Sequence, residues 1–115
     1  MFQNKRIRYD GKDYEIFWTT QHARHICSNY NSNKLHDIHH EDIAWMLEHY
    51  DAVDPERNGR FTFLNWTSRY GSVYEIHVYL VSGSRNRPGQ CVVLTGYRTN
   101  KQQYLAVAAA AQSKR

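Results

Sequence analysis

The sequence predicts an α+β fold in which an N-terminal hairpin and two helices pack on an antiparallel sheet, with the element order ββααβββα. Apolar residues alternate with polar ones near the N-terminus and again after Gly59, and two segments between them show the helical spacing i, i+3, i+4, i+7. Hydrophobic residues make up 41% of the 115 residues, which suffices for one core. We therefore expect a single domain over residues 1–115, in which 101–115 form a C-terminal helix and a frayed tail.

The first segment is predicted to form a β-hairpin. Ile7 and Tyr9 alternate with charged residues, and the Asp10-Gly11 dipeptide that follows is a turn signal. Residues 14–18 then continue with strand periodicity.

Two helices are expected next. Thr19 or Thr20 can cap the first helix by accepting a hydrogen bond from a free amide, and the polar stretch Asn29–Asn33 ends it. The second helix has acidic residues in its first turn, where the helix dipole favours negative charge, and Asp54-Pro55 stops it or follows its end. The apolar faces of the two helices are Ala23, Ile26, Cys27 and Tyr30, and Ile43, Met46, Leu47 and Tyr50.

The rest of the chain is predicted to form three strands and a final helix. Strand periodicity returns in Phe61–Leu64 and in Tyr74–Leu80. Ser82–Gln90 contains two glycines and a proline, which predicts a loop before a strand at Cys91–Tyr97. Gln102–Gln112 is rich in alanine and is expected to be helical.

The charge and the cysteine content limit the expected partners and the expected compartment of the protein. Fifteen lysines and arginines oppose eleven aspartates and glutamates, and this basic bias favours a polyanionic partner such as RNA. Cys27 and Cys91 are expected to be buried free thiols. The first residues lead into a charged stretch, and no apolar run approaches the roughly 20 residues of a membrane helix. We expect a cytoplasmic protein, in a bacterium or a phage-infected bacterial cell, with no membrane partner.

Four short segments stand out by their order and spacing. They are Thr20-Gln21-His22-Ala23-Arg24, His39-His40-Glu41-Asp42-Ile43, Gly59-Arg60-Phe61-Thr62-Phe63 and Val92-Val93-Leu94-Thr95-Gly96-Tyr97-Arg98. They resemble the "HAR" start of the first helix, the start of the second helix, the "GR" strand entry and the "VVTAYR" closing strand of the BrnT-like branch of the RelE/ParE-fold toxin ribonucleases. The similarity covers about residues 14 to 100.

The resemblance implies a RelE-like fold and metal-independent cleavage of RNA by a toxin that a protein antitoxin neutralises. The chain departs from the family pattern in two ways. Further arginines are common in and just after the family's first helix, where this chain has His25 and Asn29. The segment between the helices and the loop Ser82–Gln90 are also longer than is usual.

Metal-free RNA cleavage needs a base for the 2′-hydroxyl proton, cations for the phosphorane and an acid for the leaving 5′-oxygen. His22 is the expected proton carrier, since histidine titrates near neutral pH, and its alternative role is to cap or buttress the first helix. Arg24, Arg60 and Arg98 are the expected phosphate clamp, because the guanidinium group is a planar, permanently charged fork. Antiparallel pairing is expected to bring Arg60 and Arg98 near each other.

Tyr97 completes the expected catalytic set by hydrogen bonding to phosphate or stacking on a base. Strand alternation places Thr95 on the same sheet face as Tyr97, whereas Arg98 faces the other side of the sheet. The expected RNA-binding residues are Arg85, Arg87, Thr95 and Lys101. The alternative for Tyr97 is a half-buried sheet tyrosine, and the alternative for Arg85 and Arg87 is a solvated loop tip. The clamp arginines could instead pair with Asp51 or Asp54.

No metal or cofactor is expected. The histidines at 36, 39 and 40 are clustered, but no H-E-x-x-H or C-x-x-C pattern is present, and helix capping or exposure explains them better. A phosphate-binding glycine loop and a serine nucleophile elbow are also missing from the sequence.

Three functions are therefore consistent with the sequence. The first is a metal-independent endoribonuclease toxin with an antitoxin as its protein partner. The second is a non-catalytic, phage- or plasmid-encoded inhibitor that binds another protein, which the missing family arginines and the nine tyrosines favour. The third is an RNA-binding domain that does not cleave.

Overall fold

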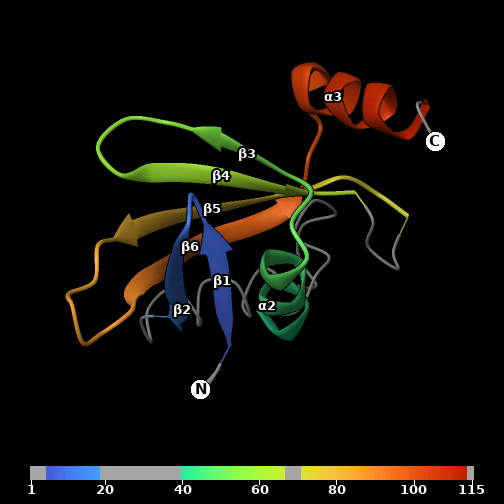
Figure 1. The fold of residues 1–115 in the computed structure, drawn as a ribbon. Coiled ribbons are helices and arrows are strands. Elements are labelled where there is room, and N and C mark those ends of the chain that lie inside the picture. The colour runs from blue at the N-terminus through green and yellow to red at the C-terminus, as the bar shows by residue number, and fades with distance from the viewer. Residues whose placement is uncertain (1–4, 19–39, 67–70, 114–115) are drawn as a thin grey trace.

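A computed structural model describes residues 5–18, 40–66 and 71–113, and these residues form an α+β fold with one six-stranded sheet and two helices (Figure 1). In chain order the elements are β1 (Arg6–Tyr9), β2 (Lys12–Trp18), α2 (His40–Glu48), β3 (Ala52–Pro55), β4 (Arg60–Asn65), β5 (Tyr74–Val81), β6 (Gly89–Arg98) and α3 (Gln102–Ser113). The α+β class is thus confirmed, while the expected first helix and its face lie outside the described residues.

The sheet is mixed, so the prediction of an antiparallel sheet is wrong. Its strand order is β1-β2-β6-β5-β4-β3, and the pairing of β2 with β6 is parallel whereas every other pairing is antiparallel. The two parallel strands are joined by a long connection, not by a tight turn, and such a connection permits parallel pairing. Alternation within a strand does not indicate the direction of its neighbour.

The N-terminal hairpin is confirmed. Asp10 and Gly11 have φ angles of 54° and 75°, the left-handed conformation that a two-residue turn between twisted strands requires. Ile7 pairs with Tyr14 across the hairpin, and both side chains are buried.

A fourth strand in the C-terminal half, β3, was not predicted. Asp54-Pro55 was expected to stop the second helix or to follow its end. α2 ends earlier, at Glu48, and these two residues pair with Thr62 and Phe61 of β4. β3 is the edge of the sheet, where proline's missing N–H costs no ladder hydrogen bond. The order of the described elements is therefore ββαββββα.

One face of the sheet packs against α2, and we call it the core face. The predicted helical stripe is correct, since Ile43, Met46 and Leu47 are fully buried. From β5 the same core receives the alternating apolar side chains of Tyr74, Ile76 and Val78. Cys91 also lies in this core, and burial raises the pKa of its thiol, so the predicted buried free thiol is confirmed there; Cys27 lies outside the described residues.

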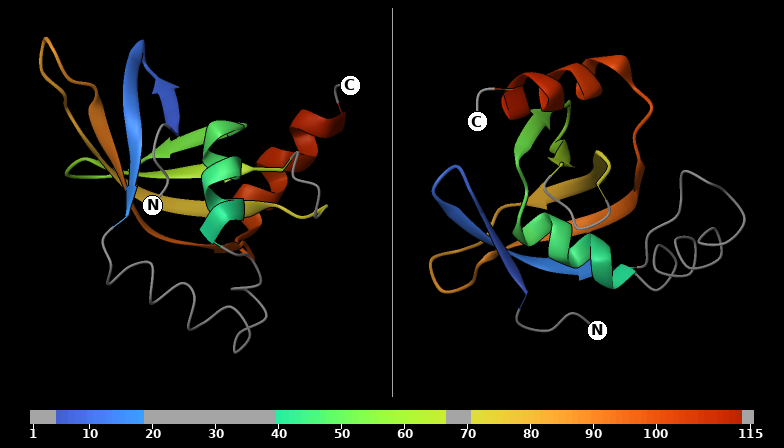
Figure 2. Two further views of the ribbon diagram at one scale, coloured as in Figure 1. Left: turned by 90° about the horizontal axis from the view of Figure 1, so that it is seen from below. Right: turned by 90° about the vertical axis from the view of Figure 1, so that its right-hand side faces the viewer.

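The opposite face, which we call the second face, carries the alternate residues of the same strands. α3 lies across one end of it, on the other side of the sheet from α2 (Figure 2). A small apolar cluster holds α3 there, made of Leu64, Trp66, Tyr104 and Ala108. Away from α3 the second face is polar, and this polar part holds the candidate site.

The remaining C-terminal predictions agree closely with the structure. β5 and β6 enclose the predicted loop, and α3 ends within one residue of its predicted end. No helix in the described part of the chain is both long and apolar enough to cross a membrane.

Candidate functional site

The central strand β5 places two ionisable residues on the second face. Glu75 and His77 alternate with the core residues of β5, yet the Glu75 side chain is fully buried and that of His77 is 9% exposed. On β6 the residue opposite Glu75 is Tyr97 and the residue opposite His77 is Thr95. On β4 the residue opposite His77 is Thr62. Strand pairing therefore gathers these groups from three neighbouring strands.

Glu75 is the buried anion of the cluster. Its Oε1 lies 2.7 Å from Nε2 of His77 and 3.2 Å from Nζ of Lys101. Burial by itself would raise the pKa of Glu75, but hydrogen bonds from His77, Thr99, Tyr97 and Lys101 together outweigh it and lower the pKa to about 2. The carboxylate is thus ionised at neutral pH, and because it can only accept, Nε2 of His77 carries a proton.

The His77 ring connects this buried carboxylate to the surface. Nε2 also lies 3.1 Å from the Tyr97 hydroxyl, and the two rings stack with centroids 5.6 Å apart. On the other side of the ring, Nδ1 lies 3.2 Å from Oγ1 of Thr62 and 3.8 Å from Oε2 of Glu56. The Thr62 hydroxyl donates to the same Glu56 oxygen at 3.0 Å. A continuous chain of polar contacts therefore runs from Glu56 to Glu75.

Tyr97 supplies a protonated hydroxyl to the cluster. Burial, followed by the hydrogen bond and the charge of Glu75, raises the pKa of Tyr97 to about 12. At neutral pH the phenol is neutral, and its proton is donated to the Glu75 carboxylate.

The rim of the cluster faces solvent and is lined by charges of both signs. The side chains of Lys101 and Glu56 are 45% and 37% exposed. Arg60 is also exposed, two residues from Thr62 on the same face, and its guanidinium carbon lies 5.7 Å from the ring centroid of Tyr79. An anion at this rim would meet a lysine on one side and an arginine on the other.

The attachment of α3 orders this rim. The Tyr104 hydroxyl donates a 2.7 Å hydrogen bond to Oδ2 of Asp54 on β3, and Lys101 lies 5.3 Å from the centroid of the Tyr104 ring. Burial, followed by the hydrogen bond to Asp54, raises the pKa of Tyr104 to about 12. One tyrosine thus fixes the start of α3, and with it Lys101, over the second face.

Four of the residues proposed from the sequence meet at this site. Tyr97, Thr95 and Lys101 contact or border the Glu75–His77 pair, and Arg60 flanks it. The Thr95 hydroxyl oxygen is buried and has no hydrogen-bond partner in the described part of the chain.

Arg98 does not belong to this group. It pairs with Tyr74 at the start of β5, whereas Arg60 pairs with Tyr79 five residues further along, which is roughly 17 Å at about 3.4 Å per residue. Residues paired directly across antiparallel strands share a face, so Arg98 lies on the core face with Tyr74 and Arg60 on the second face with Tyr79. The predicted proximity of Arg60 and Arg98 is wrong, because β4 starts opposite the end of β5 and β6 ends opposite its start.

The other proposed residues lie elsewhere. Arg85 and Arg87 are in the loop between β5 and β6, at the end of the sheet away from α3. His22 and Arg24 lie outside the described residues, as do His36 and His39.

Four residues of the site, Glu56, Thr62, Glu75 and His77, were not predicted from the sequence. A usable signal was present, because a glutamate and a histidine two residues apart in an apolar strand must share one sheet face. Alternation suggested that this face is solvated, whereas the Tyr97 ring stacks on His77 and Lys101 pairs with Glu75 there. Asp51 and Asp54 accept hydrogen bonds from the Trp66 amide and the Tyr104 hydroxyl.

Within the described ranges, no group of three or more histidine, cysteine or acidic side chains is arranged to hold a metal ion. Comparison of the chain with protein-family models, with curated proteins and with solved structures finds no match.

Proposed function

We propose that the protein is a metal-independent endoribonuclease whose active site is the rim of the Glu75–His77 cluster. One observation carries the proposal: an exposed carboxylate, a neutral phenol and two cations surround a histidine that is held by a buried carboxylate. This set contains each group that cleavage by a 2′-hydroxyl needs. The resemblance of the sequence to the RelE/BrnT toxins supports RNA as the substrate, a RelE-like fold, and an antitoxin as the partner.

Each rim residue has a role in the proposed reaction. Glu56 accepts the proton of the 2′-hydroxyl, whose oxygen attacks the phosphorus and forms a 2′,3′-cyclic phosphate. Lys101 and Arg60 stabilise the added negative charge, and the Tyr97 ring offers a surface on which a base can stack. The bond to the 5′-oxygen breaks, and His77 protonates that oxygen.

The contacts between Glu56 and His77 allow the site to return to its starting state. The proton that Glu56 takes up can pass to Nδ1 of His77 through the Thr62 hydroxyl, since the two steps span 3.0 and 3.2 Å. Glu75 fixes the ring and compensates its positive charge, so it acts as a positioning residue.

Purified protein incubated with RNA in EDTA tests the proposal. Glu56→Gln and Arg60→Gln are expected to reduce kcat by about 100-fold or more, the usual contribution of a general base or of a charge-stabilising group. Arg57→Gln is the matched control, because it removes one exposed positive charge from the same hairpin and leaves the Glu56 and Arg60 side chains in place. RNA that stays full length at high enzyme concentration across pH 5–9 would refute cleavage. Equal rates for all three variants would refute the site.

A non-catalytic binding domain is the second candidate. It is favoured by the burial of Glu75 and His77, which limits what a substrate can reach directly. This candidate predicts salt-sensitive RNA binding without product, or stoichiometric capture of a protein other than an antitoxin.

A further inference from the structure

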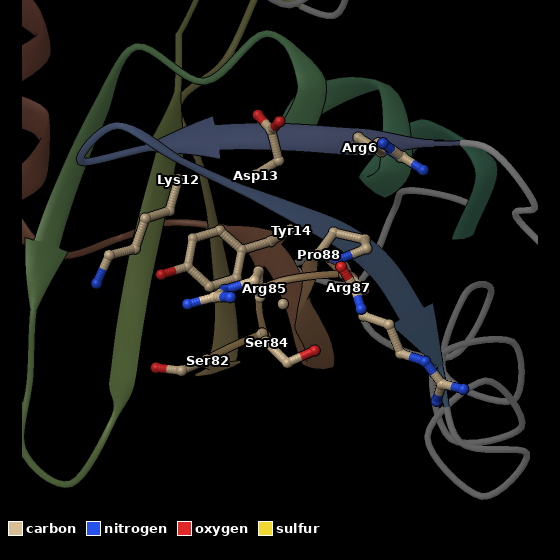
Figure 3. Close-up of a pocket in the computed structure, with 12 residues that line it drawn as sticks. Arg6, Lys12, Asp13, Tyr14, Ser82, Ser84, Arg85, Arg87 and Pro88 are labelled. Carbon is tan, nitrogen blue, oxygen red and sulfur yellow. The ribbon is translucent and has the colours of Figure 1, made fainter.

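A second polar site lies away from the Glu75–His77 cluster. A pocket of about 460 Å³ opens between the β1–β2 hairpin and the loop that joins β5 to β6 (Figure 3). The hairpin contributes Arg6, Lys12 and Tyr14, and the loop contributes Ser84, Arg85 and Arg87. The volume is within the range of pockets that hold small ligands, roughly 300–1,000 Å³.

The walls of the pocket are fixed by close backbone packing. A Cβ atom on Gly89 would lie 2.4 Å from the Val81 carbonyl oxygen and 2.7 Å from the Tyr14 ring, so the ring rests directly on the glycine backbone. In the loop, Ser84 and Arg87 exchange two backbone hydrogen bonds of 3.0 and 3.3 Å. The hairpin and the loop therefore present their polar groups in a defined arrangement before any ligand binds.

The pocket has an excess of positive charge. Its acidic lining residue, Asp13, forms a 2.9 Å ion pair with Arg8, and Arg6 is paired with Glu15 at 3.3 Å. Lys12, Arg85 and Arg87 have no acidic partner among the residues that the structure describes. Figure 3 shows basic side chains from both segments around the Tyr14 ring.

We propose that this pocket binds a phosphate of an RNA strand. Arginine forks and a lysine provide the donors that phosphate oxygens accept, and the serine hydroxyls of the loop add neutral donors.

An acidic peptide of a protein partner would satisfy the same charge, but the surface around the pocket does not fit one. Protein interfaces bury aromatic and aliphatic side chains at their centre. The large hydrophobic side chains that are exposed in the described part of the chain are Phe17, Tyr79, Val81 and Val107, and none of them lines the pocket. The walls instead combine positive charges and hydroxyls, which favours a phosphate group.

The inference rests on the proposed function in taking RNA as the ligand, but it concerns a contact separate from the reaction. Gly89 at the pocket and Thr95 at the cluster are six residues apart on β6, which is roughly 20 Å at about 3.3 Å per residue. The pocket would therefore hold a nucleotide outside the scissile step, so it should affect substrate affinity and leave the chemical step unchanged.

Fluorescence anisotropy with a labelled 2′-O-methyl RNA 12-mer tests the pocket without cleavage, because this RNA lacks the attacking hydroxyl. The Arg85→Gln/Arg87→Gln variant is expected to bind at least tenfold more weakly than the wild type. The slope of log K against log salt should become shallower by about 0.7, the contribution of one lost phosphate contact for a single strand. Arg57→Gln removes an exposed charge outside the pocket and should change the affinity less than twofold.

Three results would overturn the inference. The double variant could bind the RNA as tightly as the wild type, or Arg57→Gln could lose as much affinity. An acidic peptide of twelve residues could bind the wild type more tightly than the RNA, which would assign the pocket to a protein partner. Adenosine monophosphate could bind while the RNA does not, which would assign it to free nucleotides.

The cleavage assay separates this inference from the proposed function. If the wild type cleaves RNA, the double variant should raise KM and leave kcat unchanged. If the wild type does not cleave, weaker binding by the double variant still supports the pocket while the nuclease proposal fails.

Discussion

Glu75→Gln gives the sharpest prediction on stability, because the pKa of this group is strongly lowered by its hydrogen bonds. The substitution keeps the shape of the side chain and removes the charge that holds His77 and Lys101. The pKa of Glu75 falls from an ordinary 4.5 to about 2, and each pKa unit corresponds to about 1.36 kcal/mol, so ionised Glu75 stabilises the fold by about 3 kcal/mol. The glutamine variant should lose about this amount at pH 7.

The dependence on pH has a definite sign. The folded pKa lies below the unfolded one, so the contribution is fully present above about pH 4.5 and is lost as the pH falls toward 2. Urea unfolding of both proteins at pH 7, 5, 4, 3 and 2.5 should therefore give two curves that converge at low pH. A difference below 1 kcal/mol at pH 7, or one that stays constant down to pH 2.5, would show that Glu75 is not the stabilising anion described above.

Two further substitutions test the packing around the two sites. Tyr104→Phe removes the 2.7 Å hydrogen bond to the Asp54 carboxylate and should lower the free energy of unfolding by about 1.5 kcal/mol, with faster hydrogen exchange in α3. Tyr79→Phe, on an exposed tyrosine, is the control, and equal losses in both variants would contradict the role of Tyr104. Gly89→Ala should cost about 2 kcal/mol, because the new methyl group would meet the Tyr14 ring at 2.7 Å. Thermal unfolding measures this loss, and an unchanged Tm would show that the Tyr14 ring is not closely packed on Gly89.

Much of the fold follows from local patterns in the sequence. The hairpin turn is determined by Asp10-Gly11, and α2 by its buried stripe at Ile43, Met46 and Leu47. These features depend on neighbours within a few residues, so a single sequence is sufficient to predict them.

The errors concern contacts between distant parts of the chain. The parallel pairing of β2 with β6 brings together residues 14–18 and 89–93, and no local pattern encodes it. Strand β3 was missed because it is four residues long and ends in proline, which is usually a break. Arg60 and Arg98 were expected to be neighbours because the register of β4 and β6 on β5 cannot be read from alternation.

The candidate site was found only in part for the same reason. Tyr97 and Lys101 were identified as polar groups near the end of the last strand, whereas Glu75 and His77 fit an ordinary half-exposed strand pattern. Their importance comes from the burial of both side chains and from contacts with β4, with β6 and with Glu56. Burial of a charged residue is a property of the folded chain, and alternation alone predicts the opposite.

The end groups of RNA cut in EDTA test the central claim most directly. We expect mass spectrometry of the products from the wild type to show 2′,3′-cyclic phosphates, and the same products to form at least 100-fold more slowly with Glu56→Gln, while Arg57→Gln reacts at the wild-type rate. Absence of cleavage, products with 3′-hydroxyl ends, or an undiminished rate with Glu56→Gln would contradict a nuclease site at the Glu75–His77 cluster.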